Sequence, residues 1–537
     1  MPSLRSLTAS ALVAGAFILS PAGGGALGAQ VSPDLPTGSR VEWAVEKLVG
    51  FGLVDDRIIS IRPWSRGEAL RLIEEARSNL HRLTVEERTA AEGILRQIRD
   101  EELSGSVRMD GALGATTMDS PWLSIPEDTN TGGIDAEVNH LARYHGGREL
   151  VDGHTVAVES GLEVVLGQHA AAQLRPRVWW GDPRAGSGDD GFQLLQAQAR
   201  FQLSNLRLDI GRSPAMWGPG RNGGGLMSDN ARGLDRIRIS SDAPFRWPGF
   251  LSFLGPTRAE AFLALLEEDR DVPKSKLVGY NVAIRPHPRF EAWFSTHIQS
   301  GGEGAPTAST WSRVADHLLF IDWIFNGGET FFFSNKGTSL GFQVRMPAWR
   351  HAQLFAEFTL EDKGHNPRRI FWQDGGWLMG AWFPRLDLSG NYDLRFEFYH
   401  SGVRMHRHDQ FTSGRTVNRM LLALGDVNTD GAFLELGFNR PGLRTTFEAG
   451  VENRSADVWD RRFRADGEFD VFVKIDDRPD EFYLRGLAKL TAYAADGREV
   501  SVGVGLARVA DSRFQAGATR YDRILQVTGR IPLLERR

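Results

Sequence analysis

Arginine, tryptophan, carboxylate and amide side chains concentrate in one glycine-rich stretch near the middle of the chain. Arg212 comes first, the run Trp217-Gly218-Pro219-Gly220 follows, and Ser228-Asp229-Asn230 and Arg232 come after a further glycine cluster. These groups donate and accept hydrogen bonds, pair charges and offer a flat apolar ring. No paired carboxylates and no nucleophile with a neighbouring base accompany them. The residues therefore favour binding or packing over catalysis, and we do not expect an enzyme.

Two strands position this stretch. Leu206, Leu208 and Ile210 alternate with Arg207 and Asp209, and a second strand-like run covers residues 234–239. A loop this rich in Gly and Trp needs unusual backbone angles around a rigid aromatic wedge. We expect the motif residues to face inward and to plug a lumen between the two strands: Arg212, Trp217, Gly218, Pro219, Gly220, Ser228, Asp229, Asn230 and Arg232.

Two short motifs resemble catalytic or cofactor loops but lack the context that such loops need. Residues 218–223 fit G-x-G-x-x-G, yet a dinucleotide loop must open a helix, and glycine, polar residues and another strand follow here. Residues 337–341 fit G-x-S-x-G, yet the sequel alternates as a strand instead of forming the helix of a nucleophile elbow. We predict neither a nucleotide cofactor nor a hydrolase.

Two further clusters could ligate a metal ion. Residues 426–431 match the first half of a calcium loop, but the closing acidic position falls at Gly437, so a turn is favoured over a calcium site. The run His406-Arg407-His408-Asp409 carries two imidazoles, but Arg404 and Arg407 would repel a cation, so we expect an exposed loop. No resident metal or cofactor is predicted.

Composition limits the class of protein. The chain has 537 residues, no cysteine and a formal net charge of −5 at pH 7. The lack of cysteine excludes disulfides, thiolate metal sites and cysteine nucleophiles. The weakly acidic balance does not suggest a nucleic-acid partner. A content of 60 Gly and 15 Trp suits a sheet with tight turns and an aromatic belt at a membrane interface.

Residues 1–29 are predicted to be a signal peptide. Arg5 supplies the positive charge, residues 7–19 form the apolar core, and small residues follow at 22–29. The apolar core is too short for a transmembrane helix, and no later stretch holds 18 apolar residues in a row. If the mature chain spans a membrane, it must therefore do so with strands.

Residues 30–105 differ from the rest of the chain in the spacing of their apolar residues, and this spacing predicts a small helical bundle. Apolar residues recur at helical spacing, and Ser65 with Glu68 and Thr84 with Glu87 are candidate capping boxes. Residues 46–52 followed by residues 62–68 are similar to an S-layer-homology repeat. Three roles are left open for this bundle: a solvated domain without a further function, a periplasmic plug of the barrel, or a cell-wall tether.

From residue 106 to residue 537 the period changes to two. The alternating segments number very roughly eighteen, are mostly about ten residues long, and carry Arg and Glu on one face, as tilted spanning strands with a wet lumen do. We predict an all-β transmembrane barrel of about 18 antiparallel strands, whose closure removes edge strands. The last strand is expected to end near Ile531. Aromatic residues near segment ends suit interfacial girdles: Trp179, Trp180, Phe245, Trp247, Trp323, Phe331 to Phe333, Trp372, Trp377, Trp382 and Phe383.

The succession Gly211-Arg212, Trp217-Gly218-Pro219-Gly220, Leu226, Ser228 and Asn230-Ala231 resembles the signature of the Wzi family of capsule-assembly proteins. The resemblance implies a bacterial outer-membrane barrel that holds capsular polysaccharide at the cell surface, with the helices as a periplasmic plug. It makes the motif loop a candidate glycan contact as well as a plug. It also directs attention to basic loops that could meet an acidic polymer, notably Arg368, Arg369, Arg404 and Arg407.

The alternatives to this function are a diffusion porin and an envelope protein tethered to the cell wall. Lumen-facing charges fit a porin as well as a closed barrel, because charge alone does not reveal whether the lumen is open. The expected partners are surface polysaccharide of acidic character, outer-membrane lipid and, for the tether, peptidoglycan. The chain is expected to act as a monomer.

Overall fold

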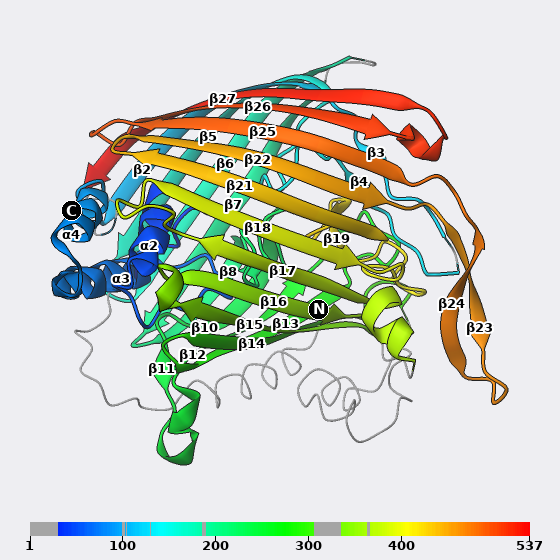
Figure 1. Cartoon of the computed structure of the whole chain (residues 1–537), viewed down its shortest axis with the longest axis horizontal. Coiled ribbons are helices and arrows are strands. Elements are labelled where there is room, and N and C mark those ends of the chain that lie inside the picture. Colours follow the sequence, from blue (N-terminus) through cyan, green and yellow to red (C-terminus); the bar gives the residue numbers. More distant parts are fainter. Residues whose placement is uncertain are drawn as a thin grey trace.

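The computed structural model describes residues 31–98, 103, 105–128, 130–184, 189–305, 334–361 and 366–536. Over this part of the chain, 18 antiparallel strands close into a barrel, preceded by helices (Figure 1). Closure is completed where β2 (Val107–Asp119) pairs on one side with β5 (Gly153–Leu166) and on the other with β27 (Thr519–Arg536). The barrel predicted from the alternation is therefore confirmed.

Each remaining barrel strand pairs with its neighbour in chain order. These strands are β6 (Ala170–Pro183), β7 (Asp189–Leu203), β8 (Leu206–Ser213), β10 (Leu234–Ser241), β12 (Pro256–Leu265), β13 (Lys276–His287), β14 (Phe290–Ser300), β15 (Ser334–Met346), β16 (Ala352–Leu360), β17 (Gly375–Phe383), β18 (Tyr392–Ser401), β21 (Thr429–Arg440), β22 (Leu443–Arg454), β25 (Glu481–Tyr493) and β26 (Glu499–Ala510).

Alternation along each strand separates an apolar exterior from a polar lumen. On β5, Val156 and Val158 are exposed whereas Thr155 and Ala157 are buried. The exterior is apolar because lipid surrounds it, and the lumen can hold charge because oppositely charged side chains pair there. The largest fully buried side chains include five lumen arginines: Arg177, Arg200, Arg207, Arg238 and Arg258.

The two ends of the barrel differ in the length of their connections. At one end the connections are short, as at residues 167–169 and 204–205. At the other end they include residues 120–152, 214–233 and 402–428. Outer-membrane barrels have short periplasmic turns and longer extracellular loops. The helices and Arg536 lie at the short-turn end, which is therefore the periplasmic end (Figure 1).

Three helices form a bundle at the periplasmic end: α2 (Arg40–Gly50), α3 (Arg66–Ser78) and α4 (Val85–Leu95). Their apolar faces share one core that includes Val45, Leu48, Leu72, Ile73 and Leu95. A short 3₁₀ turn, η1 (Leu80–Arg82), joins α3 to α4. In the part of the chain that the structure describes, no helix is long and apolar enough to cross a membrane.

The two predicted capping boxes have different outcomes. At α4, Thr84 and Glu87 bind each other's backbone N–H groups, so this box is complete. At α3, the Ser65 Oγ accepts from the Glu68 N–H at 3.0 Å, but the Glu68 carboxylate instead pairs with Arg71 at 2.7 Å. The reciprocal half of that box is therefore wrong, because an (i, i+3) arginine competes for the carboxylate.

The helices are fixed to the barrel by buried charges. The Lys47 ammonium lies 2.6 Å from the Asp393 carboxylate and donates to the Pro384 carbonyl at 2.8 Å, where β17 turns into β18. Arg385 pairs with Glu87 of α4 at 2.8 Å, and Arg66 of α3 pairs with Glu163 of β5 at 2.5 Å. These contacts hold the bundle over the periplasmic mouth.

Several finer expectations are corrected or lie outside the described residues. β27 continues to Arg536, so the predicted end near Ile531 is wrong. Of the predicted girdle, Trp180 and Trp372 are exposed, whereas Trp179 and Trp382 are buried. Both buried indoles lie beneath arginine groups, Arg177 and Arg395 respectively, so they pack against lumen charges. The signal peptide at 1–29, Trp323 and residues 331–333 lie outside the described part of the chain.

Candidate functional site

The stretch between β8 and β10, residues 214–233 and here called the Gly-Trp loop, folds into the barrel. Within it, β9 (Met216–Trp217) pairs antiparallel with β1 (Ile61–Arg62) from the N-terminal part of the chain. The Gly218 N–H extends this pairing by donating to the Ser60 carbonyl at 3.1 Å. Two segments about 150 residues apart in sequence thus meet inside the lumen.

Trp217 is the apolar centre of this contact. Its side chain is 1% exposed and packs against Phe262 of β12 with ring centroids 5.5 Å apart. Its indole N–H donates to the Glu260 carboxylate. A buried indole needs such a partner, because an unpaired N–H would retain its desolvation cost. Trp217 therefore fixes the loop to the barrel wall, as its predicted plugging role requires.

The glycines of the motif allow the loop to lie directly on strand β16. At Gly218 the backbone angle φ is +97°, and a Cβ atom would lie 2.6 Å from a carboxylate oxygen of Glu357. A Cβ at Gly224 would lie 2.4 Å from the same carboxylate. That close approach allows the Gly225 N–H to donate to Glu357 at 2.7 Å. Any larger residue at Gly218 or Gly224 would push the loop off the wall.

Arg62 holds the turn at Pro219 through backbone carbonyls. Its guanidinium donates to Gly220 O at 2.5 Å, to Gly218 O at 3.3 Å and to Arg221 O at 3.1 Å. A planar fork with several donors suits such a set of acceptors better than a lysine ammonium would. The N-terminal segment therefore recognises the shape of the Gly-Trp loop as well as pairing with it.

The second half of the Gly-Trp loop contacts two extracellular loops. Ser228 N–H donates to the Leu422 carbonyl at 2.6 Å, and the Asn230 amide donates to the Leu421 carbonyl at 3.0 Å. In the other direction, the N–H groups of Gly146 and Gly147 donate to the carbonyls of Asp229 and Asn230 at 2.8 and 3.1 Å. Backbone and side-chain bonds thus join loops 120–152, 214–233 and 402–428.

Asp229 is the motif residue with the most unusual electrostatics. Burial raises the pKa of its carboxyl to about 7, and the Arg148 guanidinium opposes this shift only in part. Its backbone is well bonded, since its N–H donates to Asn222 O at 2.9 Å. The acid therefore titrates near neutral pH in a closely packed junction.

The structure contradicts the inward-facing prediction for Arg212. This residue lies on β8 with the parity of Ile210, whose side chain is 44% exposed on the barrel exterior, and it pairs across the sheet with Asp235 at 2.6 Å. Strand alternation places both charges on the outer face. Arg232 lies beside the same carboxylate at 3.6 Å, so it is a rim residue rather than a core of the plug.

A second buried network joins loop 120–152 to the wall. Arg143 donates to Glu452 at 2.7 Å, the Tyr399 hydroxyl donates to the same carboxylate at 3.2 Å, and His140 Nδ1 also donates to it. The His140 ring stacks on Tyr483 with centroids 3.8 Å apart. Burial, aided by the Arg143 charge, lowers the pKa of His140 to about 3, so the imidazole is neutral at physiological pH.

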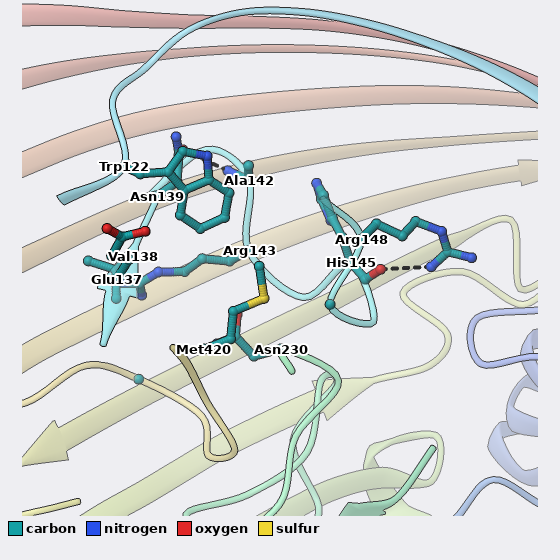
Figure 2. Close-up of a pocket in the computed structure, with 12 residues that line it drawn as sticks. Trp122, Glu137, Val138, Asn139, Ala142, Arg143, His145, Arg148, Asn230 and Met420 are labelled. Carbon is teal, nitrogen blue, oxygen red and sulfur yellow. Dashed lines mark hydrogen bonds between the residues drawn. The ribbon is translucent and has the colours of Figure 1, made fainter. Parts of the chain in front are cut away.

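A small cavity lies where the three loops meet (Figure 2). Trp122, Arg143, His145, Asn230 and Met420 line it and come from all three loops. Two of its polar side chains already bond within the loops: the Trp122 N–H donates to Leu150 O at 2.8 Å and the Arg148 guanidinium to His145 O at 2.7 Å. The cavity is therefore a seam between loops rather than a built ligand pocket.

The metal-like clusters of the sequence do not converge. Asp426 is buried and pairs with Arg454 at 2.7 Å, whereas Asp430 pairs with His400 at 2.7 Å. His406 is 1% exposed, so the exposed-loop expectation for residues 406–409 is wrong at this position. Among the residues that the structure describes, no group of three or more His, Cys, Asp or Glu side chains is placed to hold a metal ion.

The two catalytic-looking motifs lie in strand and loop. Residues 337–341 belong to β15, and Ser339 is buried on the lumen side. Residues 218–223 continue into isolated bridges at Gly220, Gly223 and Ser228 rather than into a helix. The readings of these motifs as a strand and a plain loop are therefore confirmed.

Comparison with known proteins decides the family. The model of the family "Capsule assembly protein Wzi" matches residues 132–431, more than half of the chain. The chain belongs to the Wzi capsule assembly family. The matched range includes the Gly-Trp loop and loop 402–428. The Wzi signature residues from Trp217 to Ala231 therefore belong to a loop that bonds to loop 402–428 in the lumen. With its apolar exterior, this Wzi family barrel lies in the bacterial outer membrane.

Two relatives give the extent of the similarity. Over 153 residues the Wzi family chain is 27% identical to an uncharacterized 55.8 kDa protein in the cps region of Klebsiella pneumoniae, covering 26% of this chain and 30% of that protein. The chain therefore spans less than a third of this curated relative. The solved Escherichia coli Wzi, an outer-membrane protein of group 1 capsule assembly described as a carbohydrate-binding β-barrel, is 13% identical, with a TM-score of 0.66 over 94% of this chain and 100% of that chain.

Another outer-membrane protein has lower similarity to this Wzi family barrel. Pseudomonas aeruginosa OprD is 10% identical, with a TM-score of 0.42 over 80% of this chain and 96% of that chain.

The four arginines predicted to contact a glycan are placed differently from one another. Arg368 is exposed. Arg369 is buried against Asp374 at 2.5 Å and lies over the Phe469 ring at 3.9 Å. Arg404 is buried and pairs with Asp409 at 3.2 Å. Arg407 is buried too, and donates to the carbonyls of Pro126 and Gly132 at 2.5 and 3.2 Å.

The extracellular hairpin of this Wzi family chain was missed as a candidate site. It comprises β23 (Val458–Phe463) and β24 (Phe469–Asp476) and extends beyond the barrel wall (Figure 1). Arg462 and Arg464 are about half exposed, and Phe463 between them is 58% exposed. The sequence run Arg461-Arg462-Phe463-Arg464 was a signal that could have identified it.

Proposed function

We propose that this protein binds and anchors an acidic capsular or extracellular polysaccharide at the outer surface of the cell. Membership of the Wzi capsule assembly family supports the capsule role. The Escherichia coli relative is described as carbohydrate-binding. The observation that carries the proposal is the contact between β1 and β9, which makes the barrel a filled support for extracellular loops.

A filled lumen argues against the diffusion porin. The helical bundle covers the periplasmic mouth, and residues 59–61 bond to Glu291, Asn281 and Arg258 of the wall strands. The Gly-Trp loop meets Ile61 and Arg62 from the extracellular side. A solute channel through this part of the barrel would have to displace side chains that are buried and bonded. The alternative predicts steady conductance in a planar bilayer, whereas the anchor predicts a closed barrel.

The glycan surface we propose lies on the exposed extracellular elements. Arg368 is exposed, and the hairpin residues Arg462 and Arg464 lie in half-exposed surface pairs with Asp470 and Asp466. Because such surface pairs are weak, these guanidinium groups can exchange to the carboxylates of an acidic polymer. Phe463 adds an exposed ring against which an apolar sugar face can pack. Arg369, Arg404 and Arg407 support this surface from below through the internal bonds that they make.

The Gly-Trp loop supports the surface indirectly. Trp217 and the loop glycines contact the barrel wall, so they would position loop 402–428 through Ser228 and Asn230 rather than touch the glycan. A direct glycan contact within this loop is the weaker candidate, because the side chains of Trp217 and Ser228 are buried.

Binding of purified protein to the polysaccharide of its own strain tests the proposal. Detergent-solubilised protein is immobilised, and polysaccharide binding is measured at increasing salt. Wild type should bind and lose affinity as salt rises, since charge pairing is screened. The triple variant R368A/R462A/R464A should bind more weakly. A control variant at arginines of the periplasmic end, R440A/R498A, should bind as wild type does. Equal binding by all three proteins would refute this surface.

Attachment to the cell wall is a second hypothesis for the function of the helices. Residues 46–52 and 62–68, which resemble an S-layer-homology repeat, form parts of α2 and α3 and the strand before α3. Their side chains are largely buried against the barrel, as Lys47 and Arg66 are. Sedimentation of the whole protein with purified peptidoglycan tests this reading, and binding there would add a partner without removing the glycan role.

The chain is proposed to act as a monomer, since a single barrel carries the plug and the loops that the anchor needs. Light scattering on the detergent-solubilised protein measures this directly, after subtraction of the bound detergent. A mass corresponding to one chain supports the proposal. A stable larger assembly would contradict it.

A further inference from the structure

A short apolar segment projects from the periplasmic rim and is not used by the plug or by the loops. Residues 247–256, here called the apolar finger, run from the end of β11 (Phe245–Arg246) to the first residue of β12 and contain the 3₁₀ helix η2 (Gly249–Leu254). Figure 1 shows η2 projecting away from the barrel wall, at the same end as helices α2 to α4. Its direction is therefore outward rather than across the mouth.

The two phenylalanines of the finger are the most unusual feature of this rim. Phe250 is 84% exposed and Phe253 is 65% exposed. A 3₁₀ helix repeats every three residues, so these two rings share one face. Leu251 and Leu254 share a different face and are half-buried. The finger thus packs one apolar face on the protein and leaves a second apolar face uncovered.

Glycine and proline residues fix the shape of the finger. Pro248-Gly249 opens it and Gly255-Pro256 closes it, and both glycines have positive φ, +63° and +69°. At Gly255 a Cβ would lie 2.0 Å from the Arg285 carbonyl of β13, so the backbone is held close to the wall. A loop shaped in this way presents Phe250 and Phe253 in a set direction instead of collapsing them onto the barrel.

The exterior of the adjoining strands continues the same apolar surface. Ile237 of β10 and Val282 of β13 are 40% and 39% exposed on the outward face. Beside the finger, Arg246 extends a side chain that is 63% exposed, with Asp56 at 3.9 Å as a distant partner. An apolar face with a cation at its edge has the pattern of a segment at the boundary between acyl chains and headgroups.

We propose that the apolar finger is a lipid anchor that inserts Phe250 and Phe253 into the periplasmic leaflet of the outer membrane. Arg246 would lie at the level of the phospholipid phosphates. The continuity of the finger with the lipid-facing wall favours lipid over a periplasmic protein as the occupant. The anchor holds the rim beneath the Gly-Trp loop at a fixed depth, and it does not depend on glycan binding.

Because the chain has no native cysteine, a label attached to an introduced cysteine reports the membrane depth of that position alone. Single cysteines replace Phe250 or Phe253 and carry a nitroxide label, and the protein is reconstituted into phosphatidylethanolamine–phosphatidylglycerol vesicles. Collisions of the label with oxygen, which enters the acyl region, are compared with collisions with a water-soluble nickel chelate present on both sides. Correct assembly is verified for each variant by its heat-modifiable migration on a gel.

Two matched controls set the scale. Ser252→Cys lies on the third face of η2, and Ala495→Cys lies on the exposed β25–β26 turn of the same periplasmic end. Labels at 250 and 253 should collide with oxygen and lose most collisions with nickel, whereas the label at 495 should do the reverse and 252 should be intermediate. If labels at 250 and 253 met nickel as freely as the label at 495, the finger would face water and the proposal would be overturned.

Discussion

Ile61 and Trp217 pair across a two-residue antiparallel bridge inside the barrel, joining the segment before helix α3 to the loop between β8 and β10. This single relationship connects the periplasmic bundle to the extracellular loops. From Trp217 the connection continues through Ser228 to Leu422 and through Asn230 to Leu421. The lumen therefore acts as one packed unit, and its stability should govern how well the surface loops are presented.

Replacing Trp217 by Ala should lower folding yield before it changes glycan binding by protein that does assemble. The substitution removes a buried ring and leaves the Glu260 carboxylate without its indole donor, which together should cost about 3–5 kcal/mol. The temperature at which the compact gel band converts to the unfolded band measures the loss. Trp217→Phe retains most of the side-chain volume, so its conversion temperature should lie between those of wild type and Trp217→Ala. Assembly at wild-type yield with polymer retention lost would reverse this ranking.

Replacing Arg62 by Ala should loosen the Gly-Trp loop without unfolding the barrel. The change removes a charged donor shared by three backbone carbonyls, a loss of roughly 2 kcal/mol. Limited proteolysis should then cut within residues 214–233 sooner than in wild type. Arg62→Lys keeps the positive charge but loses the planar guanidinium that donates to three carbonyls, so it should slow proteolysis of the loop only in part. Unchanged cleavage in the alanine variant would mean that the carbonyl contacts do not hold the loop.

Replacing Asp34 by Ala should release the N-terminal segment from the barrel wall. Its carboxylate lies 2.6 Å from Arg200, 3.0 Å from Arg207 and 3.2 Å from Arg238, so its removal leaves buried guanidinium groups short of a partner. Breaking such a buried network costs roughly 3–5 kcal/mol. Planar-bilayer recordings should show channel openings for the variant and a closed wild type. Asp496→Ala, on an exposed turn, serves as the control and should stay closed.

The same network should resist mild acid. Burial alone would raise the pKa of Asp34, but the Arg200, Arg207 and Arg238 charges outweigh burial and hold its pKa well below the ordinary range. A carboxyl whose folded pKa is depressed contributes stability above its unfolded pKa and loses it only as pH falls through the lower folded value. The wild-type lumen should therefore remain closed through the pH range in which ordinary carboxylates titrate, near pH 4. Openings that appear there would contradict this.

Asp229 should make the loop junction more stable in mild acid than in mild base. Burial raises its pKa to about 7, so the folded protein holds a proton that the unfolded chain releases near pH 4. Stability is then full below the unfolded value and falls as pH rises through the folded value. Asp229→Asn should remove this slope, raising the melting temperature at pH 8 more than at pH 5. An equal effect at both pH values would exclude a raised pKa.

The barrel could be predicted because its physical cause is local. Each strand has one face toward lipid and one toward the lumen, so consecutive residues alternate between apolar and polar or small. Val156 and Val158 on the outside and Thr155 on the inside are an example, and this pattern can be recognised without knowledge of distant contacts. The same rule could have corrected Arg212. Leu206, Leu208 and Ile210 were assigned to one face, and Arg212 has their parity, so its outward placement was already implied.

The partners of the motif loop could not be predicted, because they are distant in the chain. Nothing near Trp217 indicates that Ile61 is its neighbour, and nothing near Gly218 indicates that a Glu357 carboxylate leaves no room for a side chain. Arg404 and Arg407 looked solvated because they are charged, and His406 because it lies between them in the sequence. They are buried because loop 402–428 folds back over the lumen and brings Asp409, Glu361 and the Gly132 carbonyl to them.

The most direct test of surface anchoring is the distribution of polysaccharide in a strain that lacks this gene. Cell-bound and shed polysaccharide are measured after gentle washing, in wild type, in the deletion strain and in the deletion strain complemented with the wild-type gene. Anchoring predicts that total polymer stays the same while the bound fraction falls and the shed fraction rises, with recovery on complementation. An unchanged bound fraction in the deletion strain would contradict it.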